Sequence, residues 1–368
     1  MAAGFAYKSG VLGEWQRVKN FSLQILKHLT LKKLKNLLIV EYELLRKKDK
    51  VKGRPYILKV YANNKCNLRC PFCYTGMGKK MWQMGLAAGE NPSGEMDLHI
   101  FQHVIDELGP YCFQVLLYGY GEPLFHPKIY EMISFAKSKN VGVAVSSNMT
   151  VLKPGDADRI VQSGLEHLTV SIDGVTPETY RVYRVGGDYH QVVANVKAVI
   201  EAKRRLKSRL PVIEWQYIVN RSNEHEMDEA RRLAAEWGVD LIRFRPLFVY
   251  GEDEATFREW MPKDESLSLY DYRTRRMKKQ DGSCAWLYRV GVISWDGSIA
   301  PCCYYNDEPE SYFGLMNESK SFAESWNNEN FVFSRALSRD GRKKTTDLVN
   351  ELTKKNVCRK CDIVHIKN

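Results

Sequence analysis

The chain has 368 residues, of which 44% are hydrophobic and 27% charged, a composition that excludes a disordered or fibrous protein. At about 150 residues per domain its length suffices for two domains, and no apolar run is long enough to cross a bilayer. Its first residues lack the apolar core of a secretory signal, so we expect a cytoplasmic protein, in which the tight spacing of the nine cysteines favours metal binding over disulfides.

The net charge of +11 is concentrated in residues 1–55, which hold 13 Lys and Arg but only 4 Asp and Glu. Over residues 12–50, leucines recur at helical spacing between lysines, which predicts one or two basic amphipathic helices. These helices either pack against the rest of the protein or lie on an anionic membrane surface, at the inner face of the membrane. Nucleic acid is the weakest alternative, because only Phe21 and Tyr42 could stack on bases there.

Residues 56–250 alternate β-rich runs with helical patterns. Strands are expected at 56–62, 114–120, 142–147, 167–172, 212–219 and 241–248, and helices at 98–108, 128–139, 156–164, 188–206 and 224–237. Six such repeats predict a parallel sheet with right-handed crossovers. The expected fold is α/β, a partial (βα)6 TIM-type barrel with an N-terminal helical extension and its chemistry at the carboxyl ends of the strands. The periodicity alone does not decide whether the barrel closes.

The remaining chain breaks this pattern. Residues 251–283 are charged and irregular and are expected to form a linker. Residues 284–368 are expected to form a small domain, with a β-hairpin at the Asp296-Gly297 turn followed by helical pieces.

Three cysteines follow the first predicted strand in a C-x3-C-x2-C loop: Cys66, Cys70 and Cys73. Three thiolates can hold three irons of a [4Fe–4S] cluster and leave the fourth iron open to a small molecule, whereas a structural cluster or zinc site needs four ligands. The alternatives are a zinc knuckle with a distant fourth ligand and three buried cysteines.

This loop resembles the cluster loop of the radical S-adenosylmethionine (SAM) superfamily, and the resemblance extends over residues 56–250. It implies that the GYGEP segment and the ends of the third and fourth strands bind SAM, and that the residue before the third cysteine borders the adenine. The SAM-binding residues implied in this way are Phe72, Gly121, Glu122, Pro123, Ser147, Asn148, Ser171 and Asp173. Met149 stands where the family usually has a glycine.

Four polar residues on the last two strands are candidates for contact with SAM or substrate near the barrel mouth: Gln216, Asn220, Arg243 and Arg245. Buried salt bridges are an equally good interpretation of the two arginines. No residue is assigned a catalytic role, and residues 75–96 are suggested as a lid.

A second cysteine set comprises Cys284, Cys302, Cys358 and Cys361, with Cys303 as a substitute for Cys302. Four thiolates suit a fully ligated [4Fe–4S] cluster. The segment resembles the twitch domain, a short form of the SPASM domain, which implies one auxiliary cluster; a zinc ribbon is the alternative. Cys112, among apolar neighbours, is expected to be a buried thiol without chemistry.

The resemblance implies two [4Fe–4S] clusters, SAM, and an external one-electron reductant of the flavodoxin or ferredoxin type. Reductive cleavage of SAM would give a 5′-deoxyadenosyl radical that abstracts hydrogen from substrate. We expect oxidation of a polyhydroxylated small molecule or a lipid-linked glycan, with the auxiliary cluster as electron acceptor. The alternatives are modification of a ribosomally made peptide, epimerisation or rearrangement, and a non-catalytic zinc or iron–sulfur protein.

Overall fold

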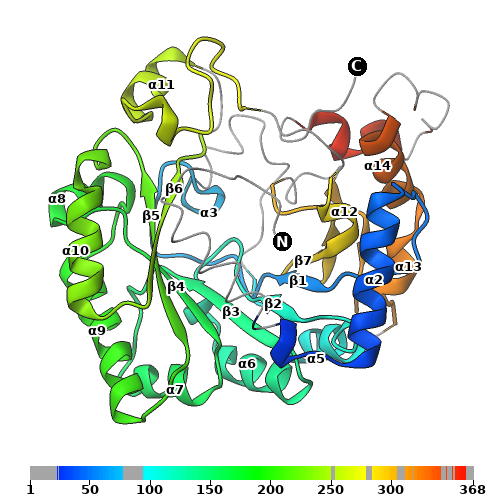
Figure 1. The fold of residues 1–368 in the computed structure, drawn as a ribbon, viewed down its shortest axis with the longest axis horizontal. Coiled ribbons are helices and arrows are strands. Elements are labelled where there is room, and N and C mark those ends of the chain that lie inside the picture. Colours follow the sequence, from blue (N-terminus) through cyan, green and yellow to red (C-terminus); the bar gives the residue numbers. More distant parts are fainter. Residues whose placement is uncertain are drawn as a thin grey trace.

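The computed structural model describes residues 23, 25–77, 94–249, 253–278, 284–304, 311–317, 319–340, 345, 350 and 353–361. A single curved sheet runs through them, with strand order β6-β5-β4-β3-β2-β1-β7-β8-β9. Figure 1 shows helices along the outer side of its barrel part. This is the α/β architecture expected from the sequence.

Six parallel strands form the partial barrel: β1 (Ile57–Val60), β2 (Gln114–Leu116), β3 (Gly142–Ser147), β4 (His167–Ser171), β5 (Val212–Val219) and β6 (Leu241–Pro246). Each pairs in parallel with the next, as predicted. The bounds of β3 and β5 are those predicted. β2 ends four residues early because the chain turns there into the GYGEP loop.

Helices follow the strands and cover their outer face (Figure 1): α5 (Leu98–Leu108), α6 (Ile129–Ser138), α7 (Asp156–Gln162), α8 (Pro177–Tyr183), α9 (Tyr189–Arg205) and α10 (Met227–Trp237). Shorter turns are α3 (Tyr74–Met77), η1 (Pro123–Phe125) and η2 (Glu224–Glu226). Trp215 of β5 stacks on Trp237 of α10 with ring centroids 4.9 Å apart, so it faces this helical layer. Because side chains alternate along a strand, Glu214 and Gln216 lie on the inner face of the sheet.

The C-terminal part continues the same sheet. β7 (Val290–Ile293) pairs in parallel with β1, and β8 (Ser298–Ala300) and β9 (Gly314–Leu315) add antiparallel strands. The predicted hairpin is confirmed, with Gly297 at φ +83° in its turn. The helices here are α12 (Trp286–Arg289), α13 (Phe322–Trp326), α14 (Glu329–Asp340), η6 (Thr353–Lys355) and η7 (Val357–Lys360).

Residues 253–278 lie in the stretch expected to be a linker, but they are folded. They contain α11 (Glu254–Trp260) and η3 (Glu265–Leu267), and Tyr270 bridges to Met277. Phe257 and Met261 are buried in a cluster that also holds Cys70. This part of the stretch therefore packs over the cysteine loop instead of forming an extended connection.

The N-terminal helix α2 (Leu31–Leu45) is anchored at both ends. Near its start, Lys33 donates to the carbonyl oxygen of Asn140, at the amino edge of β3. Toward its end, Glu41 pairs with Arg289 of α12. Figure 1 shows α2 beside the C-terminal helices. It thus connects the base of the barrel with the C-terminal part.

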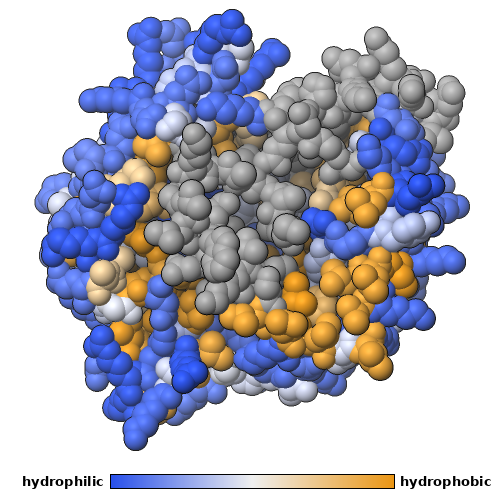
Figure 2. Space-filling view, viewed as in Figure 1, coloured by the Kyte–Doolittle hydropathy of each residue, from blue (hydrophilic) through white to orange (hydrophobic). Residues whose placement is uncertain are grey.

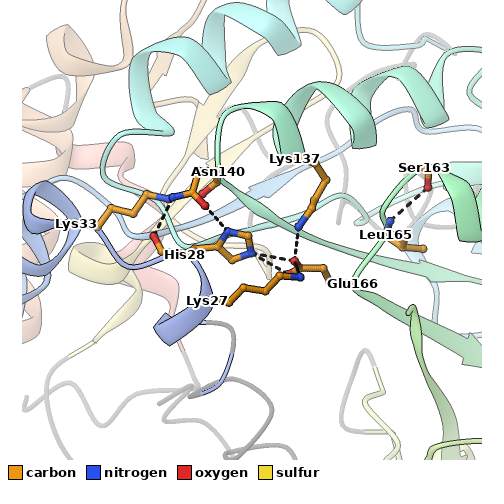
Figure 3. A network of polar contacts seen from close by, with 8 residues as sticks. All are labelled: Lys27, His28, Lys33, Lys137, Asn140, Ser163, Leu165 and Glu166. Atoms are coloured by element: carbon orange, nitrogen blue, oxygen red, sulfur yellow. Dashed lines mark hydrogen bonds and ion pairs between the residues drawn. The ribbon is translucent and has the colours of Figure 1, made fainter. Parts of the chain in front are cut away.

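A buried carboxylate secures the turn of helix before α2 (Figure 3). Glu166 accepts hydrogen bonds from Lys27, Lys137 and His28, with the Lys27 Nζ–Oε1 distance 2.6 Å and the His28 Nε2–Oε1 distance 2.9 Å. Burial alone would raise the pKa of Glu166, but these partners outweigh it and lower the pKa to about 2. The network is structural and lies at the end of the barrel opposite the cysteine loop.

Among the described residues, no helix is long and apolar enough to cross a membrane.

Candidate metal and SAM site

The first cysteine set lies in the loop between β1 and α3, at the carboxyl edge of the sheet. Cys70 is buried, whereas Cys66 and Cys73 are half-buried. The loop is held by a bond from the Cys73 amide to the carbonyl oxygen of Cys70 (3.1 Å) and one from the Arg69 amide to that of Val185 (2.9 Å). Burial raises the pKa of Cys66 and raises that of Cys70 to about 12. Metal binding at these thiols must therefore displace protons.

A buried ion pair lies against this loop. Arg184 Nε is 2.5 Å from Asp173 Oδ2, and its Nη1 is 3.8 Å from the sulfur of Cys70. Asp173 Oδ1 accepts from the backbone amide of Ile218 at 2.6 Å. Asp173 therefore fixes Arg184 beside the cluster loop, and its predicted contact with SAM stays a prediction.

The GYGEP segment is pinned to the same loop. Gly121 has φ +80°, and an added Cβ would lie 2.5 Å from Asn63 Oδ1. The carboxylate of Glu122 is buried and accepts from the amides of Asn148 (2.7 Å) and Leu124 (3.1 Å), the latter in the turn begun by Pro123. Burial raises the pKa of Glu122 despite these donors. Glu122 thus ties the loop after β2 to the end of β3.

The ends of β3 and β4 complete this edge of the sheet. Asn148 Nδ2 lies 3.6 Å from the sulfur of Cys66, and Ser147 Oγ accepts from the amide of Met149. Met149 has φ +57°, the left-handed conformation that its glycine counterpart in the family would adopt freely. Ser171 is buried at the end of β4. The structure therefore gathers the predicted residues of β3 and β4 around the cysteine loop, while their contacts with SAM stay predictions.

An aromatic group encloses the loop on its other side. The ring of Phe72 meets Trp260 of α11 edge-on at 5.1 Å, and Trp260 also contacts Tyr183 at 6.2 Å. Most of the suggested lid, residues 78–93, lies outside the described residues.

Two of the four substrate candidates, Gln216 and Arg243, contact each other. Arg243 Nη2 donates to Gln216 Oε1 at 3.0 Å on the inner face and pairs with Glu214 at 2.5 Å. Asn220 instead is buried in a turn, where its Oδ1 accepts from the amide and hydroxyl of Ser222. Arg245 is half-buried on the same side of β6 as Arg243.

The second cysteine set is drawn together from distant segments. The charges of Cys303, Cys358 and Cys284 act on the thiol of Cys302, those of Cys284 and Cys361 act on Cys358, and that of Cys361 acts on Cys284. The amide of Cys284 donates to Ser338 of α14 at 2.7 Å, and the amide of Cys358 donates to the buried Asn356 at 3.0 Å. Burial raises the pKa of Cys284 to about 11. Four half-buried thiols are therefore gathered near α14.

Cys303, Cys358 and Cys284 all lie near the thiol of Cys302, and Cys303 stays a substitute for it as the fourth ligand. Cys303 packs against the main core. Cys112 is fully buried and its sulfur donates to the carbonyl oxygen of Gln114 at 3.0 Å, which matches the expected buried thiol.

Both sets have the donors that iron–sulfur clusters require, three and four thiols respectively. Among the described residues, no three His, Cys, Asp or Glu side chains lie close enough together to hold a single metal ion. The thiols of each set are thus neighbours without forming a closed mononuclear site.

Arg184 and Trp260 were not found from the sequence. Arg184 follows α8 in a run of charged and polar residues, where an arginine is usually exposed. Trp260 lies in the charged stretch expected to be a linker. The spacing of Phe257, Trp260 and Met261 is a helical signal that could have indicated α11.

Comparison with known families matches both parts of the chain. Residues 60–217 match the radical SAM superfamily, and residues 284–362 match SPASM, an iron–sulfur cluster-binding domain. The first match runs from the end of β1 into β5 and includes the cysteine loop, and the second covers all four cysteines of the second set.

Individual relatives are distant. Over 77% of its length the chain is 22% identical to the tungsten-containing aldehyde ferredoxin oxidoreductase cofactor-modifying protein of Pyrococcus furiosus, of which it covers 84%. Over 56% of its length it is 26% identical to mycofactocin maturase MftC of Mycobacterium tuberculosis, of which it covers only 49%. In fold it resembles SuiB of Streptococcus suis in the crystal structure bound to S-adenosylmethionine, with a TM-score of 0.57 at 14% identity over 84% of this chain and 73% of that one.

These matches and the two thiol sets agree with each other. The cofactors that the two domains imply are SAM and two [4Fe–4S] clusters. The chain therefore contains a radical SAM domain followed by a C-terminal SPASM-type iron–sulfur domain.

Proposed function

We propose that this radical SAM enzyme oxidises a hydroxyl-rich small molecule or a lipid-linked glycan. The substrate would lose a hydrogen atom from a carbon that bears a hydroxyl, then one electron and the hydroxyl proton, which leaves a carbonyl. When bound, the cofactors supply the abstracting radical, after one electron from an external reductant, and an auxiliary cluster that accepts the substrate electron. Cys66, Cys70 and Cys73 would hold the first cluster, and Cys284, Cys302, Cys358 and Cys361 the second.

The observation that carries this proposal is a contact between the segment that follows Cys302 and the barrel mouth. Tyr304, two residues after Cys302, lies against Phe248 at the exit of β6, with ring centroids 5.8 Å apart. The charge of Arg245 acts on the phenol of Tyr304. A substrate near Arg245 would therefore lie within reach of an auxiliary acceptor.

The inner face of the barrel favours a polar substrate. Gln216, which is paired with Ser171 at the carboxyl end of β4, accepts a hydrogen bond from Arg243 at 3.0 Å. On β1, the Nζ of Lys59 lies over the ring of Tyr118, 4.6 Å from its centroid. Such groups hydrogen-bond hydroxyls and would be poorly matched to an apolar ligand.

Peptide modification is the second candidate, and the comparisons favour it. MftC is named a maturase, and SuiB has also been crystallised with its precursor peptide SuiA, in a structure with a TM-score of 0.56 to this chain. A peptide would have to place a C–H bond in the same polar interior.

Deuterium transfer distinguishes these candidates. The reconstituted enzyme would be incubated with polyols deuterated at the carbinol carbon, or with deuterated peptides, and the 5′-deoxyadenosine analysed by mass spectrometry. Transfer from a polyol together with a carbonyl product supports the proposal. Transfer from peptides alone contradicts it, and a polyol returned as its stereoisomer indicates epimerisation.

The cysteine sets can be tested separately. Anaerobic reconstitution should give about eight irons and eight sulfides per chain. Zinc in their place would contradict the proposed radical SAM activity. Cys66→Ala should abolish formation of 5′-deoxyadenosine. Cys361→Ala should still cleave some SAM but yield no oxidised product, and unchanged turnover would refute the auxiliary role.

A further inference from the structure

α2 is an inverted amphipathic helix, with a polar buried side and an apolar exposed side. Its buried residues are Lys33, Asn36, Val40 and Glu43. The polar ones are satisfied inside the protein: Asn36 donates to the carbonyl oxygen of Arg54, and Glu43 accepts from the amides of Lys52 and Gly53. This arrangement fixes which side of the helix faces outward.

The outward side is a continuous apolar surface, here called the leucine face. Leu31 is 88% exposed, Leu38 63% and Leu45 79%. The leucine face consists of Leu23, Leu26, Leu29, Leu31, Leu34, Leu38, Tyr42 and Leu45. Figure 2 shows hydrophobic residues gathered at the lower right, where α2 lies in Figure 1. Within the described residues, only four other large hydrophobic side chains are exposed, and they lie elsewhere.

The charges around the leucine face are all of one sign. Among the described residues from 23 to 52, every exposed charged side chain is a cation. These cations are Lys27, Lys32, Lys35, Arg46, Lys47, Lys48, Lys50 and Lys52. The acids of the segment are directed inward: Glu41 pairs with Arg289, Glu43 caps backbone amides, and Asp49 pairs with Arg339.

We propose that the leucine face docks on an anionic phospholipid bilayer, with α2 lying in the plane of the headgroups. Its leucines would enter the acyl boundary while the flanking cations bind lipid phosphates. A second copy is a poor occupant, since it would bring the same cations against these ones. Nucleic acid would pair with the cations but leave the leucines in water. Lipid supplies both chemistries at once.

The test is cosedimentation of the full chain with vesicles of phosphatidylcholine or of equimolar phosphatidylglycerol and phosphatidylcholine, across a salt series. The wild type should bind the anionic vesicles, less so as salt rises. Leu31→Glu/Leu38→Glu should weaken binding by about tenfold or more. The matched control Val182→Glu/Val185→Glu adds the same charge at two exposed apolar residues outside the leucine face and should leave binding unchanged.

The charge contribution is tested by Lys32→Ala/Lys35→Ala, which should weaken binding by about thirtyfold, since each of the two cations near an anionic surface contributes about 1 kcal/mol. Arg231→Ala/Arg232→Ala, on the exposed side of α10, is its control. No binding by the wild type, equal binding to both vesicle types, or equal loss in variants and controls would overturn the proposal and favour an acidic protein partner. All these substitutions are at exposed residues, so folding should not confound the result.

Discussion

At the scale of single residues, the site depends on close backbone approach and on one buried ion pair. Gly121 brings the GYGEP segment against Asn63 and Lys65, and Arg184 joins Asp173 to the cysteine loop. The glycine could be predicted from its motif. The arginine could not, because its partners Asp173 and Cys70 are brought to it only by the folded sheet.

Gly121→Ala should reduce SAM cleavage strongly, because its Cβ would lie 2.5 Å from Asn63 Oδ1 and 2.9 Å from the amide nitrogen of Lys65. The matched control is Gly155→Ala, which has a similar φ of +84° but no atom within 4 Å of the new Cβ. The control should lose only about 1 kcal/mol of stability from its left-handed backbone. The measurements are 5′-deoxyadenosine formation and thermal unfolding of both variants. An equal loss of SAM cleavage in the two variants would contradict a role for the close approach of Gly121 to Asn63 and Lys65.

Arg184→Met should destabilise the protein by about 3–5 kcal/mol, since it leaves the buried carboxylate of Asp173 without its partner. The double variant Arg184→Met/Asp173→Asn should recover part of that loss. Urea unfolding measures both effects. Iron content after reconstitution, compared at equal folded fraction, reports whether Arg184 also positions the cluster loop. If the double variant is no more stable than the single one, the unpaired carboxylate of Asp173 is not the cause of the lost stability.

At the scale of elements, the strands were predictable and the surroundings of α2 were not. Alternation of β-rich and helical runs located all six barrel strands, because each buried strand carries its own local pattern. The leucine pattern correctly indicated a helix in the N-terminal segment. It gave no indication that the polar side is buried, since Asn140, which binds Lys33 of α2, and Glu166, which binds His28 before α2, are more than 100 residues away. The helix α11 was also missed, because it lies in a stretch rich in charged residues.

Glu166→Gln should lower stability at neutral pH by about 2 kcal/mol, a value reduced because Lys27 is half exposed and partly screened. The pKa of Glu166 is lowered from 4.5 to about 2 in the folded protein, so its contribution is complete above about pH 4.5 and is lost as the pH falls toward 2. The wild type and the variant should therefore converge in stability over that window. Urea unfolding from pH 7 to pH 3 measures this, with exposed Glu131→Gln as control; parallel curves would contradict it.

At the scale of the whole molecule, segments far apart in the sequence share one sheet and one buried cation. Arg335 is fully buried and donates to the carbonyl oxygens of Leu287 (2.9 Å), Trp326 (2.9 Å) and Asp49 (3.1 Å). The guanidinium of Arg335 also lies over the ring of Trp326, 4.7 Å from the ring centroid. Burial lowers the pKa of Arg335 to about 10, so it remains charged at neutral pH.

Arg335→Met should lower the free energy of unfolding by about 3 kcal/mol or more, because it leaves buried carbonyl groups unsatisfied in three segments. The exposed Arg232→Met is the control. Far-UV circular dichroism and tryptophan fluorescence should shift together, since the barrel and the C-terminal part are one sheet. A shift in only one signal would show that the two parts unfold independently.

The parallel pairing of β7 with β1 also has a consequence for biosynthesis. β1 immediately precedes the first cysteine loop, yet one of its two edges remains open until residues 290–293 have been made. During translation the barrel therefore stays incomplete until most of the chain has left the ribosome, and an open strand edge is a site of aggregation. A barrel expressed without its C-terminal part would carry that edge permanently, so the two iron–sulfur domains cannot be treated as interchangeable modules.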